Sequence, residues 1–282
     1  MHINRFWAAI LLGIPLIYLV VFFITPLGMV VVDSFSNREG ELTLENYALV
    51  LGDSYYWRVL GYTFWIALVT CVATLILGYP LAYYMSLIER RRAVRRLCFI
   101  LILMPLFTSN IVRSFGWIVL LGREGLVNET LMWLGIVDRP LRLLSTEIAI
   151  IIGMIYVMLP FMVLAIASVL QNMNGALREA ARDLGATAFS TFLKVTLPLS
   201  APGIVAGTLI VFTLSISSYV TPRIMSGGRS VVSSMLIYDQ FMLVFNPYLG
   251  SAIAVVLLVA SFALIVAYTL LLERRPGRRA SP

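Results

Sequence analysis

Six long apolar stretches, separated by short polar ones, dominate the pattern of hydrophobic and polar positions along the chain. A bilayer core of about 30 Å needs about 20 consecutive, mostly apolar residues of helix. Each stretch meets or approaches this length and therefore predicts one membrane-spanning helix. The predicted spans are 6–32, 62–88, 97–121, 148–170, 203–220 and 249–272. We expect an all-α, polytopic membrane protein with six transmembrane helices, forming a single domain over 1–282.

The first apolar stretch resembles a signal peptide only in its position. It runs for 27 residues without a charge, whereas the apolar region of a signal peptide has about 7–15 residues. It also lacks a small-x-small cleavage site before Asp33. We interpret it as an uncleaved first helix.

Lysine and arginine are unevenly distributed between the connections. The N-terminus, the 89–96 connection, the 171–202 connection and the C-terminal tail carry thirteen of them, and the other three connections carry seven. Because cytoplasmic connections are enriched in these residues, both termini are predicted to be cytoplasmic. We interpret the arginines of 90–96 and 274–279 as topological anchors, with a specific lipid or partner site as the alternative.

Composition excludes several classes of protein. With 60% hydrophobic and 12% charged residues, the chain cannot cover the surface of a soluble domain of 282 residues. The net charge of +7 does not indicate nucleic acid, because the basic residues lie in short clusters between apolar spans. The only histidine, His2, excludes Ser-His-Asp and Cys-His arrangements, and Cys71 and Cys98 lack the spacing of a metal site. We expect no catalytic residues and no metal.

The connection 171–202 carries the most informative motif. Asn174 is a plausible N-cap of a short helix, and Gly185 fits the left-handed position that ends one. Thr187 can cap a second helix, which we expect to stop near Leu197 because Pro198 lacks an amide hydrogen.

Both predicted helices are amphipathic, so they can lie on lipid headgroups or dock into a partner's groove. The small side chains of Ala180 and Ala181 favour a partner, because they allow its backbone to approach closely. The apolar faces comprise Leu177, Ala180, Ala181 and Leu184 on the first helix and Phe189, Phe192, Leu193 and Leu197 on the second.

The segment from Glu179-Ala-Ala through Gly185 to Val195-x-Leu197-Pro198 resembles the EAA loop of binding-protein-dependent ABC importer permeases, which usually have isoleucine at the position of Val195. The resemblance extends over most of the chain. Residues 112–128 and 219–222 resemble the spermidine/putrescine branch of this family, and its first permease subunit in particular.

This resemblance implies a type I ABC importer permease fold in a bacterial inner membrane. It implies that 171–202 docks into an ATPase subunit, with Glu179 offering a carboxylate, Ala180 and Ala181 allowing close approach, and Gly185 setting the bend. Leu197 and Pro198 would join the loop to the fifth span. The implied partners are a second permease subunit, two ATP-binding subunits and a periplasmic solute-binding protein.

The implied solute is a polyamine or a similar small organic molecule. ATP and magnesium would bind the ATPase subunits, since this chain has no GxxxxGK[ST] phosphate loop and cannot bind ATP through a Walker motif. We expect this chain to bind no cofactor.

Few residues are candidates for lining the solute path. Arg113 is a charge inside a predicted span, so it indicates either a wet cavity or a side chain that snorkels to the outer interface. At the outer edge the candidates are Glu147, Tyr219, Tyr238 and Asp239. Polyamines need carboxylates and aromatic faces, and the predicted spans contain no acidic residue, which argues against a tight polyamine site in this subunit.

Two other classes of function are weaker alternatives. A self-sufficient secondary transporter or channel requires ionisable residues within its spans, and Arg113 is the only one. An intramembrane enzyme is disfavoured because the chain has no GxSxG motif and no histidine beyond His2.

Overall fold

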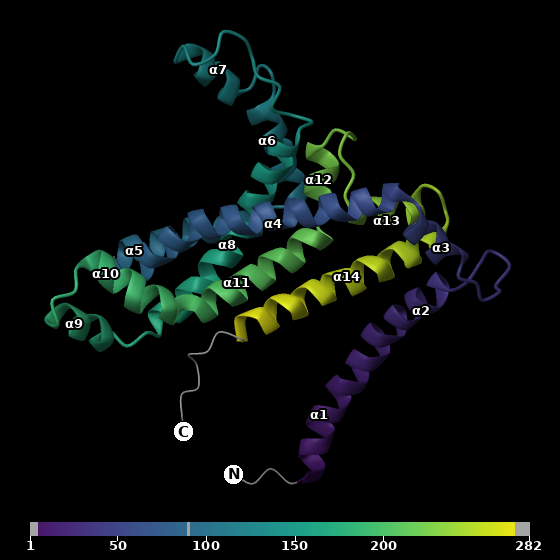
Figure 1. Cartoon of the computed structure of the whole chain (residues 1–282), viewed down its shortest axis with the longest axis horizontal. Coiled ribbons are helices and arrows are strands. Elements are labelled where there is room, and N and C mark those ends of the chain that lie inside the picture. Colours follow the sequence, from purple (N-terminus) through teal and green to yellow (C-terminus); the bar gives the residue numbers. More distant parts are fainter. Residues whose placement is uncertain (1–4, 89–90, 274–282) are drawn as a thin grey trace. The chain divides into compact units, whose positions relative to one another are not determined.

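A computed structural model describes residues 5–88 and 91–273 (Figure 1). Within these ranges the chain is helical apart from one isolated antiparallel bridge between Ser36 and Leu42. Its contacts divide it into two compact units, Met1–Leu60 with Leu236–Pro282 (unit 1) and Gly61–Met235 (unit 2). His2, Arg90 and the arginines predicted to anchor the tail lie outside the described residues.

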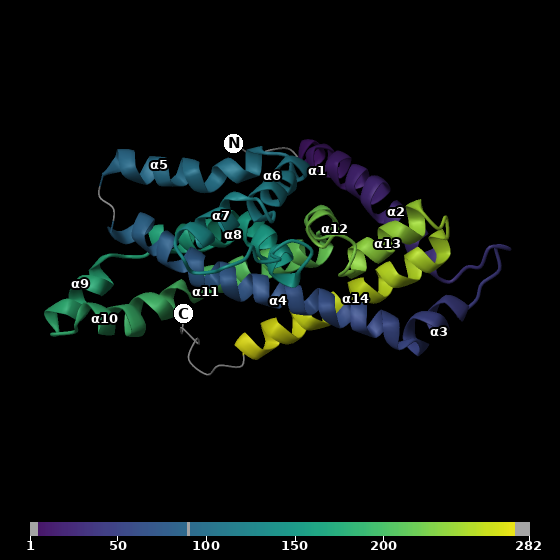
Figure 2. The ribbon, with the colours of Figure 1, turned by 90° about the horizontal axis from the view of Figure 1, so that it is seen from above.

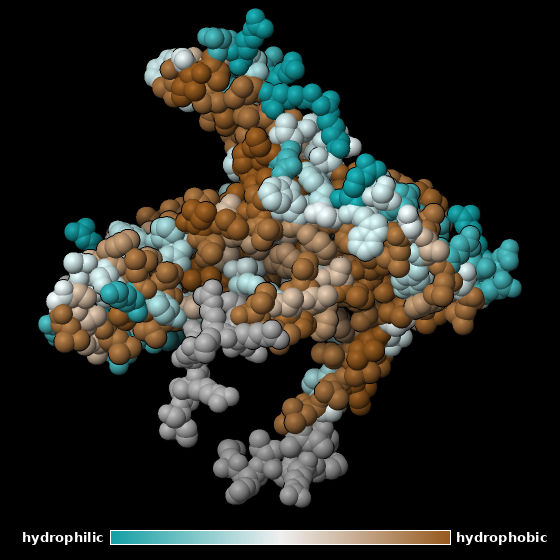
Figure 3. Space-filling model, viewed as in Figure 1, coloured by the Kyte–Doolittle hydropathy of each residue, from teal (hydrophilic) through white to brown (hydrophobic). Residues whose placement is uncertain are grey.

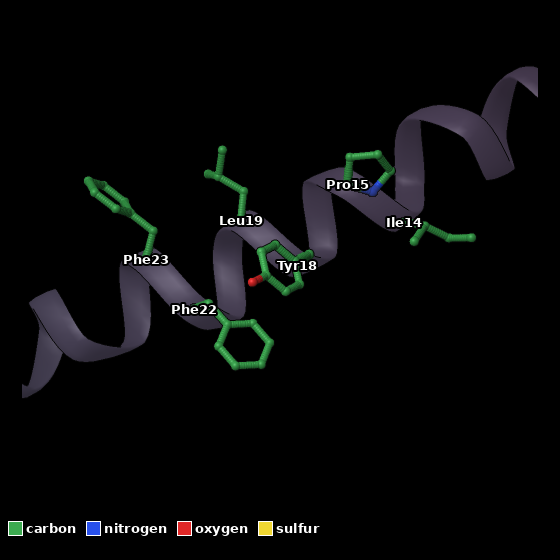
Figure 4. Close-up of a pocket in the computed structure, with 6 residues that line it drawn as sticks. All are labelled: Ile14, Pro15, Tyr18, Leu19, Phe22 and Phe23. Carbon is green, nitrogen blue, oxygen red and sulfur yellow. The ribbon is translucent and has the colours of Figure 1, made fainter. Parts of the chain in front are cut away.

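The helices of unit 1 are α1 (Arg5–Leu19), η1 (Val20–Ile24), α2 (Thr25–Ser34), α3 (Glu45–Gly52) and α14 (Pro247–Glu273). The first three form one apolar segment, and α14 packs against α2 and α3. Along α1 and η1 lies a shallow groove whose lining side chains all come from this one segment, including Tyr18 stacked on Phe22 (Figure 4). It contains no charged side chain, so it is an apolar helix surface and not a candidate site.

The helices of unit 2 begin with the main part of α4 (Ser54–Tyr83), followed by η2 (Tyr84–Ile88), α5 (Arg92–Leu103), η3 (Met104–Phe107), α6 (Asn110–Leu121) and α7 (Leu126–Trp133). They continue with α8 (Glu147–Gln171), α9 (Ala176–Asp183), α10 (Ala188–Thr191), η4 (Phe192–Thr196), α11 (Leu197–Ser217) and α12 (Val220–Met225). The short helix α13 (Ser233–Met242) crosses the boundary between the units.

Three helices form the centre of unit 2: α4, α8 and α11 lie side by side (Figures 1 and 2). Glycines allow them to approach, since membrane helices pack through small residues. A Cβ added at Gly78 would lie 3.3 Å from Met162, and one added at Gly207 would lie 2.8 Å from the Met162 sulfur. The core between the helices includes Ile66, Met85, Ile150, Met154, Ile166 and Val211.

The third predicted span, 97–121, is not one continuous helix. The segments Arg92–Phe107 and Asn110–Trp133 meet at 102°. Pro105 removes a backbone donor at this point, and Thr108 and Ser109 have extended ψ angles of 139° and 138°. Among the described residues, five other helices are long and apolar enough to cross a membrane, and the bent pair makes six if it counts as one span.

The surface of the helices is strongly apolar. Large hydrophobic side chains such as Phe22, Ile76, Val119 and Phe262 are more than 60% exposed, and brown apolar surface covers much of the face shown in Figure 3. Patches of this extent are incompatible with a monomer in water. They fit helices that face lipid or other membrane helices.

Candidate functional site

The loop between α8 and α11 begins with α9, whose two ends are both hydrogen-bonded. At its start the Asn174 side chain accepts the amide of Ala176 at 3.0 Å, although the structure assigns the capping position itself to Gly175. At its end Gly185 has φ of +82°, and its amide donates to the Arg182 carbonyl at 2.8 Å. The Ala186 amide donates to Ala181 at 3.0 Å, which completes a Schellman motif. The predicted left-handed glycine is confirmed.

Glu179 and Ala180 on α9 are exposed and Ala181 is half-buried. Three large apolar side chains of the same loop also face outward: Leu177 is 49% exposed, Leu184 89% and Phe189 71%. We call the set Leu177, Glu179, Ala180, Leu184 and Phe189 the α9 surface. It combines one carboxylate, a small residue and bulky apolar groups, and exposed apolar groups of this kind mark a surface that contacts another protein or the membrane.

The second half of the loop differs from the prediction. Thr187 does cap α10, since its hydroxyl accepts the Ser190 amide at 3.2 Å. The predicted stop near Leu197 is wrong, because helical structure continues from Ala188 to Ser217. The wide π-helical turn η4 precedes Pro198, which occupies the first turn of α11, where its missing amide hydrogen costs little. The loop is thus continuous with the helix that follows it.

An aromatic cluster fixes this junction to α4. The ring of Phe192 packs edge-on against Tyr79 at 5.7 Å and Tyr83 at 5.5 Å between centroids. The Tyr79 hydroxyl shares a 2.9 Å hydrogen bond with Ser200 on α11. Sequence analysis missed these partners of Phe192. The spacing of the two tyrosines, one helical turn apart on the second span, was the only signal for them.

Phe192→Ala is expected to lower the free energy of unfolding by about 2 kcal/mol, below the range for a fully buried phenylalanine because Phe192 is half-buried. Thermal unfolding of the detergent-solubilised protein would measure the change. Phe189→Ala is the matched control, because Phe189 lies in the same loop but is 71% exposed. Equal shifts in the two variants would contradict the anchoring role of the cluster.

The residues predicted to line the solute path do not lie on the α9 surface. Glu147 is the first residue of α8, and the 25 residues of that helix separate it from the loop by about 37 Å. Tyr219 immediately precedes α12, also in unit 2. Tyr238 and Asp239 belong to α13 in unit 1.

Arg113 has a local role that the sequence did not predict. It lies in the first turn of α6, where its guanidinium donates to the Thr108 carbonyl at 2.8 Å and to the Asn110 side chain. Among the described residues its Nε and Nη1 atoms have no hydrogen-bond partner. Arg113 therefore stabilises the bend between α5 and α6.

No group of three or more His, Cys, Asp or Glu side chains that could hold a metal ion occurs within 5–88 and 91–273. Trp65 is a further residue that sequence analysis missed. Its indole Nε1 donates to Glu147 Oε1 at 2.6 Å, which joins α4 to the start of α8.

Comparison with known proteins gives consistent matches. The model of the family described as binding-protein-dependent transport system inner membrane component matches residues 74–275. The spermidine/putrescine transport system permease protein PotB of Escherichia coli is 34% identical over 257 residues, covering 89% of this chain and 92% of PotB. The protein of the same name from Haemophilus influenzae is 35% identical and covers 94% of both chains.

Solved structures with a similar fold are more distant in sequence. A chain of a bacterial ABC transporter involved in importing the acidic polysaccharide alginate superposes with a TM-score of 0.74 at 18% identity, covering 97% of this chain and 100% of that one. A chain from the alginate transporter in complex with a pentasaccharide-bound periplasmic protein gives 0.73 at 19% identity, covering 97% and 96%. At this identity the similarity concerns the fold.

Proposed function

Because the chain belongs to the binding-protein-dependent transport system inner membrane component family, we propose that it is the permease subunit of an ATP-driven polyamine importer. A periplasmic binding protein delivers the solute, and the motor is a pair of separate ATP-binding subunits that hold ATP and magnesium. The polyamine cargo is supported by the similarity to PotB over about nine-tenths of both chains.

The observation that carries the coupling role is the α9 surface. Helix α9 exposes Glu179 and Ala180, ends in a glycine-based Schellman motif and lies in the loop at one end of α8. Glu179 meets a basic or hydroxyl group of the ATPase, Ala180 and Ala181 let its backbone approach, and Gly185 sets the direction of the following chain.

The continuous helix through Leu197 and Pro198 supplies the mechanical link in this proposal. A displacement of the loop passes directly into α11, because no flexible break separates α10, η4 and α11. The close packing of α11 on α8 then moves both helices as a pair. This arrangement suits transport by alternating access, in which ATP-driven rocking of two permease subunits opens the solute path inward.

The excess of lysine and arginine supports an orientation in which the α9 surface and both termini are cytoplasmic, in a bacterial inner membrane. The start of α8, with Glu147, then lies at the periplasmic side. A second permease subunit, encoded by a different gene, completes the path.

Co-expression with candidate ATPase and permease subunits would test the proposal. The affinity-tagged chain is expected to co-purify with an ATPase subunit from solubilised membranes. Cells that express all subunits are expected to accumulate radiolabelled spermidine in an ATP-dependent way. Uptake by the tagged chain alone, without any ATPase subunit, would instead establish a self-sufficient transporter. ATP-dependent uptake of other solutes, without uptake of polyamines, would refute the polyamine cargo and leave the coupling role unaffected.

A further inference from the structure

The hydrogen bond between Trp65 and Glu147 lies away from the α9 surface, at the other end of α8. Thr146 caps this helix, because its hydroxyl accepts the Ala149 amide at 3.4 Å. Glu147 is therefore fixed in the first turn, where the helix dipole stabilises its negative charge. Trp65 holds one of its two carboxylate oxygens at 2.6 Å. The position of the carboxylate is thus defined by both helices.

The negative charge of Glu147 is not neutralised by a neighbouring cation. Among the residues that the structure describes, its one hydrogen-bond partner is the neutral indole of Trp65, and it has no ion pair. Its side chain is half-buried. A partly buried carboxylate attracts a cation more strongly than one in open water.

Two aromatic side chains of α4, Trp65 and Tyr62, interact with this carboxylate. Trp65 is 52% exposed, so much of its indole remains available to another molecule. Tyr62 lies one helical turn earlier on the same side of α4, and the charge of Glu147 acts electrostatically on its phenol. Indole and phenol faces attract organic ammonium groups through their negative electrostatic potential.

We propose that Glu147, Trp65 and Tyr62 form a binding site for one ammonium group of a cationic solute entering at the periplasmic mouth. The site rests on the proposed function, since it assigns a contact in this subunit to the polyamine. Glu147 neutralises the ammonium group, and Trp65 both orients the carboxylate and offers its ring. The predicted spans contain no acidic residue that could bind a cationic solute. Glu147 supplies such a carboxylate because it lies at the end of a span and not within it.

A purely structural contact between α4 and α8 would have the same hydrogen bond, and one substitution separates the two roles. Glu147→Gln keeps an oxygen that accepts the Trp65 hydrogen and removes only the charge. If the hydrogen bond is all that matters, this variant behaves like the natural protein. If the charge binds solute, transport falls while the fold is retained.

The experiment uses the complete importer in proteoliposomes, with saturating spermidine-loaded binding protein, and measures initial spermidine uptake. We expect Glu147→Gln to reduce uptake about five- to tenfold, which corresponds to about 1–1.4 kcal/mol. Trp65→Leu is expected to reduce it similarly, and Trp65→Phe by only about two- to threefold, because phenylalanine keeps an aromatic face.

Matched controls come from α7, where Glu129 and Trp133 are exposed. Glu129→Gln and Trp133→Phe make the same chemical changes and are expected to leave uptake within about twofold of the natural protein. Thermal unfolding of each purified complex tests for damage to the fold.

Two results would overturn the site. One is equal uptake in Glu147→Gln and Glu129→Gln, and the other is a loss of uptake in Glu147→Gln that is matched by a lower unfolding temperature. Both leave the proposed function standing, provided that the natural complex transports spermidine. A natural complex that hydrolyses ATP but takes up no spermidine would instead refute the polyamine cargo.

Discussion

Replacing Glu179 with lysine is expected to lower solute uptake by the assembled importer about 100-fold or more. Glu179 is exposed on α9, so the substitution costs this chain little stability. At an interface it removes a carboxylate and places a positive charge against the group that the carboxylate met. Losses of 2–5 kcal/mol are typical when one member of a buried charged pair is removed, and about 2.7 kcal/mol already corresponds to 100-fold.

Two measurements together identify the cause of that loss. The amount of ATPase subunit that co-purifies with Glu179→Lys should fall in parallel with uptake, whereas the amount of permease in the membrane should stay constant. Glu179→Gln is expected to give an intermediate result, because an amide retains one acceptor oxygen. Glu129→Lys makes the same charge reversal on exposed α7 and should leave both quantities unchanged. Full uptake by Glu179→Lys would refute the coupling role of the α9 surface.

The apolar pattern predicted the helical class well because membrane helices must satisfy their backbone hydrogen bonds internally. Its main error lies in the third span. Hydropathy averages over 97–121 and does not register that Pro105 and the extended residues Thr108 and Ser109 turn the chain by 102°. The error arises because a local backbone break leaves the mean apolarity of a segment almost unchanged.

The loop motif was predicted in more detail than its environment. Gly185 and Thr187 have the local roles that their residue types favour, because these depend on backbone conformation over a few positions. Pro198 was misinterpreted as a stop, since the preceding π-helical turn is not encoded in any simple spacing. The contacts of Phe192 with Tyr79, and of Trp65 with Glu147, join residues more than 80 positions apart and required the structure.

The packing of α11 on α8 gives the largest expected effect on stability. Gly203 is buried at this contact, and a Cβ at its position would lie 2.9 Å from the Ala165 carbonyl oxygen and 3.1 Å from the Ile166 Cα. These are backbone atoms of α8, which cannot rotate away as a side chain can. Gly203→Val must therefore push the two helices apart. Overpacking of this kind costs about 1–3 kcal/mol, and we expect a value at the upper end.

In the proposed mechanism the same contact links stability to transport, because α8 and α11 flank the loop that carries the α9 surface and can move together only while they remain packed. Gly203→Val should thus lower the unfolding temperature of the purified protein by several degrees and also reduce uptake. Gly116→Val is the matched control: Gly116 lies within α6, and beyond its chain neighbours and the nearby backbone of α6 no heavy atom comes within 4 Å of its added Cβ. Equal losses of stability in the two variants would contradict the role of the close approach of α11 to α8, because valine is a better helix former than glycine and helix propensity therefore cannot explain the loss.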